Sequence, residues 1–347
     1  MTQILVVNAG STNIKLHLVD HDGTAIPVGA LEAVDPGQVT AIAHRVVHGG
    51  PRFRDPVIID ALVRAEIFAL EGLAPIHNAP ALRAIEDAER LLPDLPQIGV
   101  FDTGFHATMP AAAASYALPA HWREDWGIHR YGFHGLSVQW SAQQVRVPRL
   151  VVCHLGGGCS VTAVADGRSV DTTMGFSPLD GLPMATRSGS VDPQALIYIL
   201  RSMGLGIDEL EHELNFGSGL LGLGGSADMR EIEAGGGGLA LDVFVHRLAA
   251  AIAAMTASLG GLDALVFTAG IGEGSATVRE RVCARLGFLG VALDRARNAV
   301  AVADCEIAGP GAPVRVHVIH AREELIAARL ARRLLGNPDD TTGSTSG

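Results

Sequence analysis

The sequence is short of cysteine and of basic charge, and each shortage excludes a class of protein. Its four cysteines, Cys153, Cys159, Cys283 and Cys305, form no C-x-x-C pair and are too few for a disulfide scaffold, so we expect a reduced, cytoplasmic setting. Acidic residues outnumber basic ones by 37 to 26, which gives a formal net charge of -11. Nucleic-acid binders need a basic face, so this charge argues against one.

Long apolar runs are also missing. No segment approaches the roughly 20 uninterrupted apolar residues that span a bilayer, and the apolar residues 248–259 form a shorter, alanine-rich run. The N-terminus passes from Thr2-Gln3 directly into the apolar run 4–7, without a basic region or a cleavage site. We therefore predict a strand there instead of a signal peptide, and a soluble protein without a membrane partner.

What the sequence does contain indicates two lobes built on one plan. Its 347 residues are long for a single core, and a hydrophobic share of 48% is ample for two. In residues 4–12, 150–160 and 265–273 a short β-branched run precedes a tight turn rich in Gly, Ser or Thr. After the first two turns a second strand ends in a hairpin signal, Asp20-His-Asp-Gly23 or Ala165-Asp-Gly167. This similarity suggests a duplicated unit with one copy per lobe.

Helical periodicity supplies the other half of an α/β architecture. Apolar residues recur three or four positions apart in residues 60–73, 79–92, 192–205, 239–259 and 276–286. Asp192-Pro193 supplies an N-cap followed by proline at the first helical position. The tail 337–347 has nothing to bury, and we expect it to be disordered.

The three turns are of a kind that can bind phosphate. Backbone N–H groups of a glycine-rich turn approach phosphate oxygens closely, and Lys15, after Asn8-Ala-Gly-Ser-Thr-Asn, adds a positive charge. No Walker A motif is present. Taken singly, the first turn could be an ordinary hairpin, the triple glycine after His154 a sharp bulge, and Ala269-Gly-Ile-Gly-Glu273 a plain strand-to-helix loop. Three such turns in one chain favour phosphate binding.

Five further segments combine arginine, histidine or aspartate with glycine or aromatic residues in apolar surroundings. Alone, each histidine could be an interior residue and each Arg–Asp pair a structural ion pair. Together they make a poor core, and two arginines suit a small carboxylate and a transferring phosphoryl group. The segments are His44-Arg45-Val-Val-His48-Gly-Gly50, Ala74-Pro-Ile76-His77-Asn78, Phe101-Asp102-Thr-Gly-Phe-His106, Tyr131-Gly-Phe133-His134-Gly135 and Thr186-Arg187-Ser-Gly189.

These motifs, in this order, resemble those of the acetate kinase family, a branch of the superfamily of hexokinase, actin and the heat-shock chaperone ATPases. The similarity extends over nearly the whole chain to Glu323-Glu324-Leu325. The matching segments are residues 6–11, 43–50, 101–103, 131–135, 171–182, 185–189 and 267–273.

The resemblance implies a fold, a domain division and an activity. The fold would be a two-lobed, duplicated ribonuclease H-like (actin-like ATPase) α/β fold with a nucleotide cleft between the lobes. Residues 1–148 plus 322–336 would form an acid-binding lobe, and residues 149–321 a nucleotide-binding lobe. The activity would be reversible, Mg²⁺-dependent transfer of the ATP γ-phosphoryl group to acetate, with Mn²⁺ as a substitute metal, by a homodimer.

The resemblance also assigns roles to single residues. Asn8 and Glu323 would hold Mg²⁺, Arg45 and Arg187 would flank the carboxylate and the phosphoryl group, and His134 would hydrogen-bond the phosphoryl oxygens. Asp102 matches the family's catalytic aspartate. Because acetate is already ionised at pH 7, no proton must be removed for attack, and we expect Asp102 to orient Arg45 or bound metal and water.

Two larger sets would bind the nucleotide and the acyl group. Asp228-Met-Arg230 could instead be a helix-start aspartate with an exposed arginine. By similarity, the nucleotide set is Lys15, His154, Leu155, Gly156, Gly157, Gly158, Asp228, Met229, Arg230, Gly270, Ile271, Gly272, Glu273 and Gly274. The substrate set is Arg45, Val47, Ile76, His77, Phe133 and Pro178.

The sequence departs from the family pattern at Asn13, Gly157, Ser190 and Ala321-Arg322, where the family usually has serine, asparagine, aspartate and Thr-Asn. The segment 20–44 is shorter than the family norm, and the triple glycine is similar to that of butyrate kinases. A propionate or butyrate kinase, an enzyme using another phosphoryl donor, and a nucleotide-binding module without catalysis therefore stay as alternatives.

Overall fold

The computed structural model describes residues 3–9, 14–70 and 75–336, so the first glycine-rich turn (10–13) and the predicted disordered tail (337–347) lie outside the described residues. The chain divides into two compact units. Residues 1–107, 133–140 and 322–347 form the first unit, and residues 108–132 and 141–321 form the second. The division at 321/322 coincides with that drawn from the sequence, whereas residues 108–132 and 141–148 group with the second unit.

The sheet of the first unit has six strands in the order β3-β2-β1-β4-β6-β5. β1 pairs in parallel with β4, and β4 with β6, while the β1–β2, β2–β3 and β5–β6 pairs are antiparallel. The strands are β1 (Gln3–Ala9), β2 (Ile14–Val19), β3 (Ala25–Val28), β4 (Val39–Val46), β5 (Val57–Ile58) and β6 (Gln97–Phe101).

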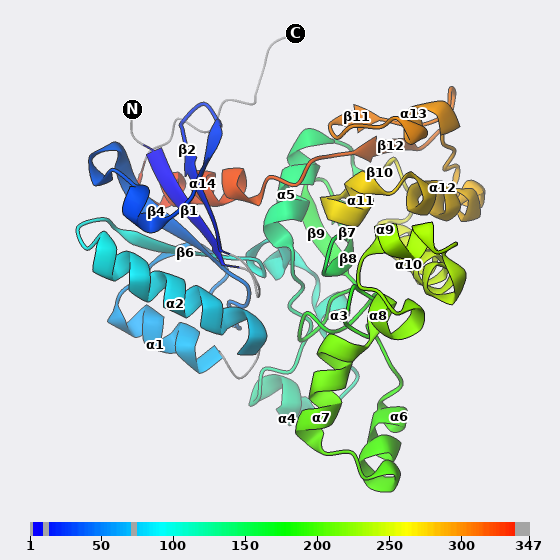
Figure 1. The fold of residues 1–347 in the computed structure, drawn as a ribbon, viewed down its shortest axis with the longest axis horizontal. Helices are drawn as coiled ribbons and strands as arrows, with labels where there is room; N and C mark the ends of the chain where they lie inside the picture. Colours follow the sequence, from blue (N-terminus) through cyan, green and yellow to red (C-terminus); the bar gives the residue numbers. More distant parts are fainter. Residues whose placement is uncertain (1–2, 10–13, 71–74, 337–347) are drawn as a thin grey trace. The chain divides into compact units, whose positions relative to one another are not determined.

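The sheet of the second unit repeats this topology. Its order is β11-β12-β10-β7-β8-β9, with β7, β10 and β12 parallel and the other pairs antiparallel. The strands are β7 (Arg149–Leu155), β8 (Cys159–Ala165), β9 (Arg168–Thr172), β10 (Ala264–Thr268), β11 (Cys305–Glu306) and β12 (Arg315–Val318). Strand for strand, β1 corresponds to β7 and β4 to β10. The predicted duplication is therefore visible in the topology of the two mixed sheets (Figure 1).

Helices α1 (Ala61–Ala69), α2 (Pro75–Leu91) and α14 (Glu323–Leu334) complete the first unit. Leu5, Val7 and Ala9 of β1 lie in one buried cluster with Ile67 of α1 and residues of α2. Ile4 and Val6, on the other face of the strand, are buried as well, and α14 contacts β1, β2, β4 and β6. A strand that is apolar on both faces, as the run 4–7 is, requires a layer on each side.

Helix α10 (Gly238–Leu259) forms the core of the second unit, where it packs on β7, β8 and β9 and on α12 (Ala276–Arg285) (Figure 1). By length and composition alone it could cross a membrane, but Phe244, Leu248 and Ile252 are buried against the sheet, as in the core helix of a soluble domain. The shorter helices are α3 (Ala111–Ala114), α4 (Ala120–Glu124), α6 (Pro193–Tyr198), α7 (Ile207–His212), α8 (Gly219–Gly224), α9 (Met229–Ala234), α11 (Ala269–Gly274) and α13 (Arg295–Ala299). Helix α5 (Gly135–Gln144) crosses the boundary between the units.

The helices predicted from periodicity are present, with shifted ends. α2 begins at Pro75, four residues earlier than predicted, and α6 passes at Ile199 into a π-helical turn. The Asp192 side chain caps α6 by accepting a hydrogen bond from the Gln194 N–H at 2.8 Å. In the second hairpin, Asp166 and Gly167 have φ values of 47° and 78°, which is the positive φ that a tight two-residue hairpin turn requires.

Candidate active site

Arg45 and Asp102 form a buried, two-pronged ion pair in the first unit. Arg45 stands on β4 and Asp102 follows the neighbouring parallel strand β6, so the carboxyl ends of both strands meet at one edge. Arg45 Nε donates to Asp102 Oδ1 at 3.1 Å, and its NH2 group donates to Oδ2. The Asp102 side chain is 0% exposed. Both oxygens of Asp102 are therefore used to hold the guanidinium plane in one orientation.

The same guanidinium contacts the two predicted metal ligands. Arg45 NH1 donates to Asn8 Oδ1 at 3.0 Å, Asn8 Nδ2 donates to Glu323 Oε2 at 3.0 Å, and Arg45 Nε lies 3.6 Å from Glu323 Oε2. Glu323 is the first residue of α14 and Asn8 lies on β1. Residues 315 positions apart thus meet because α14 packs on the first sheet. Lys15, paired across the strands with Asn8, is exposed on β2.

The electrostatics of this cluster favour a fixed pair. Burial tends to lower the pKa of Arg45, but the carboxylates of Asp102 and Glu323 outweigh it and raise that pKa above its ordinary value. Burial raises the pKa of Asp102, and the facing guanidinium opposes that shift. Because two charge-assisted hydrogen bonds join the groups, we take the pair as ionised.

His134 occupies a strained turn directly beside Asp102. Its φ of 59° is unusual for a residue other than glycine, and its backbone hydrogen-bonds the Asp102 carboxylate. The turn is held from two sides, because His106 Nε2 donates to the Phe133 carbonyl at 2.8 Å and Gly135 N–H donates to the Asp102 carbonyl at 3.0 Å. His106 was noted in the sequence only as part of a motif; the structure makes it a support of His134.

Gly135 is required at this turn for space. A Cβ at position 135 would lie 2.1 Å from the Asp102 carbonyl oxygen. We expect Gly135→Ala to lower the free energy of unfolding by about 3 kcal/mol and to reduce kcat at least about tenfold, because the backbone around Asp102 must shift. Urea unfolding and steady-state rates test this. Gly29→Ala, where a Cβ meets nothing within 4 Å, is the control. A stable, fully active Gly135→Ala would contradict the prediction.

Two buried histidines make stability depend on pH. Burial lowers the pKa of both His44 and His106 to about 4, against 6.5 for an ordinary histidine. The unfolded chain therefore binds more protons below pH 6.5, and stability is lost as the pH falls from 6.5 towards 4. At pH 5.5 each histidine should cost about 1.4 kcal/mol relative to pH 7.5.

Urea unfolding at pH 7.5 and 5.5 measures this loss. His106→Gln, whose amide can donate to the Phe133 carbonyl, should reduce the difference between the two pH values by about half. His212→Gln, at an exposed position, should leave it unchanged. Equal stability of the unsubstituted protein at both pH values would refute the assignment.

In the second unit, the triple-glycine turn and the Arg187 segment lie side by side. The turn joins β7 to β8, with His154 paired with Ser160 and Leu155 with Cys159, and Gly156 N–H bonds the Gly158 carbonyl at 2.9 Å. The Ala185 N–H donates to the Gly157 carbonyl at 3.3 Å. Gly157 is exposed, has no positive φ, and offers open space for a Cβ. The backbone therefore does not require glycine there, and the family's asparagine would fit.

Arg187 is largely buried, and carbonyl, thioether and thiol groups lie close to its guanidinium. Its NH1 group lies 3.2 Å from the Pro178 carbonyl oxygen and 3.8 Å from the Met184 sulfur, and the Cys159 thiol is near. Burial lowers the pKa of Arg187, and these three neighbours are neutral at pH 7. Electrostatic interactions of a guanidinium are stronger in such desolvated surroundings than in water.

The third turn forms the short helix α11 after β10. A Cβ on Gly272 would lie 3.7 Å from Leu155 Cβ, and Gly156 faces Ala269, so this turn packs on the triple-glycine turn. Glu273 Oε1 accepts the N–H groups of Ala269 and Ala321, and its Oε2 bonds His320 Nδ1 at 2.6 Å. Gly270 and Gly274 are exposed, and Ile271 is half-buried. Two of the three phosphate-type turns thus converge with Arg187 in one unit.

The remaining predicted site residues differ in their surroundings. Asp228 caps α9, accepting the Arg230 N–H at 2.9 Å, and Arg230 is exposed, which is the helix-start arrangement considered from the sequence; Met229 is buried. Val47, Phe133 and Pro178 are buried, and Phe133 packs edge-on against His48 at 5.3 Å. Ile76 and His77 lie in α2, and their side chains are outside the described residues.

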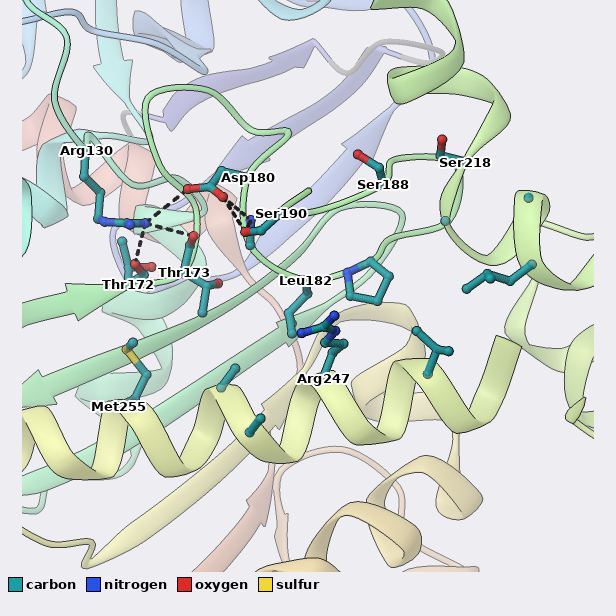
Figure 2. Close-up of a pocket in the computed structure, with 18 of the residues that line it drawn as sticks. Arg130, Thr172, Thr173, Asp180, Leu182, Ser188, Ser190, Ser218, Arg247 and Met255 are labelled. Carbon is teal, nitrogen blue, oxygen red and sulfur yellow. Dashed lines mark hydrogen bonds and ion pairs between the residues drawn. The ribbon is translucent and has the colours of Figure 1, made fainter. Parts of the chain in front are cut away.

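A pocket of about 800 Å³ in the second unit contains none of the predicted site residues (Figure 2). It lies between α10 and the loop that carries Arg187. Arg130 NH1 donates to the carbonyls of Thr172, Thr173 and Met174 and lies 3.6 Å from Asp180, whose Oδ1 accepts the Ser190 hydroxyl at 2.5 Å. An aspartate at position 190, usual in the family, would bring a second carboxylate to Asp180.

This cluster closes the base of the Arg187 loop, and sequence reasoning missed it. The Ser190 N–H donates to the Gly181 carbonyl at 3.0 Å, and a Cβ on Gly189 would lie 2.5 Å from the Leu182 backbone. The only sequence signal for Arg130 was its place beside the Tyr131-Gly-Phe-His motif.

Comparisons with known protein sequences all indicate the same family. The sequence model of the Acetokinase family matches residues 33–329. The chain is 48% identical to an acetate kinase of Protochlamydia amoebophila, over 84% of this chain and 76% of that protein. It is 50% identical to an acetate kinase of Nostoc punctiforme, over 86% and 78%.

Solved structures agree. A propionate kinase from Francisella tularensis superposes with a TM-score of 0.88 at 35% identity, covering 95% of this chain and 99% of that one. The acetate kinase of Porphyromonas gingivalis gives 0.83 at 31% identity, covering 96% and 100%. The fold is the two-lobed α/β fold of these kinases, of the actin-like ATPase type. The chain therefore belongs to the Acetokinase family.

Proposed function

We propose that this chain is an acetate kinase, which transfers the γ-phosphoryl group of ATP to acetate, reversibly, giving acetyl phosphate and ADP. The observation that carries the proposal is the 48 to 50% identity to acetate kinases over 84 to 86% of the chain. Its class is a phosphotransferase with a carboxyl group as acceptor. Transfer is direct: the acetate oxygen bonds the γ-phosphorus as the bond to the ADP oxygen breaks, without a covalent enzyme intermediate.

The two arginines differ in a way that suits this reaction. Arg45 is held flat by Asp102, so it can present a fixed edge to a carboxylate or phosphoryl oxygen. Arg187 is largely desolvated and donates to the Pro178 carbonyl, so its guanidinium would interact strongly with the three equatorial oxygens in the transition state. His134, fixed beside Asp102, would donate a hydrogen bond to the same oxygens. Together these groups position the reactants and neutralise charge.

The oxygen donors in the first unit fit a magnesium ion bound mainly through phosphates and water. Mg²⁺ usually takes one or two protein ligands beside substrate phosphates. Among the described residues, no group of three His, Cys, Asp or Glu could form a cage of protein ligands alone. Asn8 Nδ2 lies 3.0 Å from Glu323 Oε2, and Asn8 Oδ1 accepts a hydrogen bond from Arg45, so the two residues would supply one amide oxygen and one carboxylate to the ion. Such an ion, or Mn²⁺ in its place, would neutralise phosphate charge.

The nucleotide would bind to the glycine-rich turns of the second unit, with Lys15 near its phosphates. Lys15 is the only lysine in the sequence; every other residue in the basic count of 26 is an arginine. The lysine at position 15 would offer a compact ammonium group, which binds phosphate as a point charge. His154 to Gly158 and Gly270 to Gly274 would face phosphates and adenosine, and Asp228-Met-Arg230 would lie near the adenosine.

Trapping acyl phosphate with hydroxylamine tests the proposal. We expect product with ATP and acetate, at a higher kcat/KM than with propionate or butyrate. Preference for a three- or four-carbon acid would make the chain a propionate or butyrate kinase, and product only with GTP or pyrophosphate would identify another donor. No product from any combination would favour a nucleotide-binding module. The buried Val47 and Phe133 are consistent with a short acid.

We also propose a homodimer formed by the second unit. Large apolar side chains are exposed along α6, α7 and the turns beside them, including Tyr198 (55%), Met203 (59%) and Ile207 (72%). Such a patch marks an interface more often than a free surface. Light scattering should give the mass of a dimer for the unsubstituted protein and of a monomer for Tyr198→Asp/Met203→Asp. Phe288→Asp, at an equally exposed position elsewhere, should stay dimeric; a monomeric unsubstituted protein would refute the proposal.

The cysteines agree with the cytoplasmic setting proposed from the sequence. All four are free thiols, and three of them, Cys153, Cys159 and Cys283, are buried. Burial raises the pKa of each of these three thiols, which makes them poor nucleophiles.

A further inference from the structure

The indole of Trp140 lies within cation–π distance of two arginines in the first unit. The guanidinium carbons of Arg322 and Arg329 are 5.5 Å and 5.3 Å from its ring centroid. The ring is 7% exposed, and its Nε1 has no hydrogen-bond partner among the described residues. Packing and two cation–π contacts therefore fix this ring, and each contact is stronger for being largely shielded from water.

Arg322 is directly joined to the predicted metal ligand. It is the N-cap residue of α14, its carbonyl accepts the Leu325 N–H at 3.3 Å, and its side chain makes no capping hydrogen bond. Glu323 follows, and its carboxylate reaches Asn8 and Arg45. The last stretch of the chain that belongs to the first unit begins at Arg322. The direction of the Glu323 side chain thus depends on how the backbone at 322 is held.

Arg329 contacts the same indole ring and therefore serves as an internal comparison for Arg322. It lies seven residues, or two helical turns, beyond Arg322, so both arginines project from one face of α14 towards the same ring. Arg329 is six residues away from Glu323. It shares the ring with Arg322 without adjoining the carboxylate.

We propose that Arg322, by stacking on Trp140, is a positioning residue that holds the Glu323 carboxylate beside Asn8 for the metal–nucleotide complex. The inference rests on the proposed metal role of Glu323. The asparagine that the family usually has at this position could not extend a cation over the ring, so the contact belongs to the Ala321-Arg322 departure in this sequence. The chain fixes its Glu323 by an aromatic contact of its own.

The direction of the change in cation affinity distinguishes a positioning role of Arg322 from a direct effect of its charge. Removing a positive charge near a cation site would by itself tighten cation binding. Loss of positioning weakens it. We expect Arg322→Ala to raise the dissociation constant of Mn²⁺·ADP about tenfold, measured from the free Mn²⁺ signal by electron paramagnetic resonance. The Mg²⁺ concentration for half-maximal rate should rise by a similar factor, while the KM for acetate changes less than about twofold.

Three variants complete the test. Arg329→Ala should leave the Mn²⁺·ADP dissociation constant within about twofold, and Arg322→Lys should restore it to within about threefold, because an ammonium group can stay over the indole. Unchanged or tighter binding in Arg322→Ala, or an equal loss in Arg329→Ala, would overturn the inference. Glu323→Gln distinguishes the two proposals: if it leaves Mn²⁺·ADP binding unchanged, the metal assignment fails, and if it alone weakens binding, only the role of Arg322 fails.

Discussion

Replacing Arg187 by alanine should lower kcat by about 10³-fold or more, with KM values for acetate and ATP changed less than about fivefold. The reason is the setting of the side chain. Burial strengthens the electrostatic interactions of its guanidinium, and the three equatorial oxygens approach one plane only near the transition state. An interaction made mainly in the transition state affects kcat and leaves ground-state binding largely intact.

Steady-state kinetics with hydroxylamine trapping measure this loss. Arg187→Lys keeps the charge but loses the planar fork, so it should recover only part of the rate. Arg247→Ala is the matched control, since Arg247 is an exposed arginine of the same unit that lines the pocket of Figure 2. A large rise in KM with normal kcat in Arg187→Ala would show that the arginine binds substrate and transition state equally, and the proposed role would be wrong.

Asp102→Asn should reduce kcat by about 10²-fold or more. Asparagine keeps the shape of the side chain but loses the charge and one acceptor, so the two-pronged hold on Arg45 is broken. Removing one partner of a buried pair also lowers stability, by about 3 to 5 kcal/mol. Rates must therefore be normalised to the folded fraction, measured by circular dichroism at the assay temperature.

The pH dependence of the rate separates orientation from proton transfer. If Asp102 only orients Arg45, the residual activity of Asp102→Asn should follow the same pH profile as the unsubstituted enzyme. If Asp102 accepts a proton, the acidic limb of the profile should disappear in the variant. A variant that keeps most of its turnover would contradict both roles, because neither the charge nor the hold on Arg45 would then matter.

Periodicity and turn chemistry predicted the elements well, because these signals are local. The hairpin at Asp166-Gly167 and the cap at Asp192 follow from residue types alone, since only certain residues adopt positive φ or accept a helix N–H. The start of α2 was misplaced because Pro75 and Pro80 hide the helical pattern, and proline carries no periodic signal. The π-helical turn after Tyr198 has no sequence signature that would distinguish it from α-helix.

Motifs in the sequence named the candidate site residues, whereas most of the contacts of these residues could not be predicted. Arg45 and Asp102 could be named from the sequence, and the hypothesis that Asp102 orients Arg45 agrees with the bidentate pair. The support of His134 by His106, and the closure of the Arg187 loop by Arg130, Asp180 and Ser190, could not be named, because these hydrogen bonds form only where the fold brings the groups together and leave no mark on residue type.

By itself the sequence determined the α/β class, the duplication and the family, and it named candidate residues for phosphate and carboxylate, since these depend on local pattern and motif order. Only the tertiary structure decided which charges are neutralised. Asn8, Arg45, Asp102 and Glu323 come from β1, β4, the end of β6 and α14, and they form one network because parallel strands end at a common edge under a returning helix. Trp140 and Arg322 are 182 positions apart, and only packing brings them into contact.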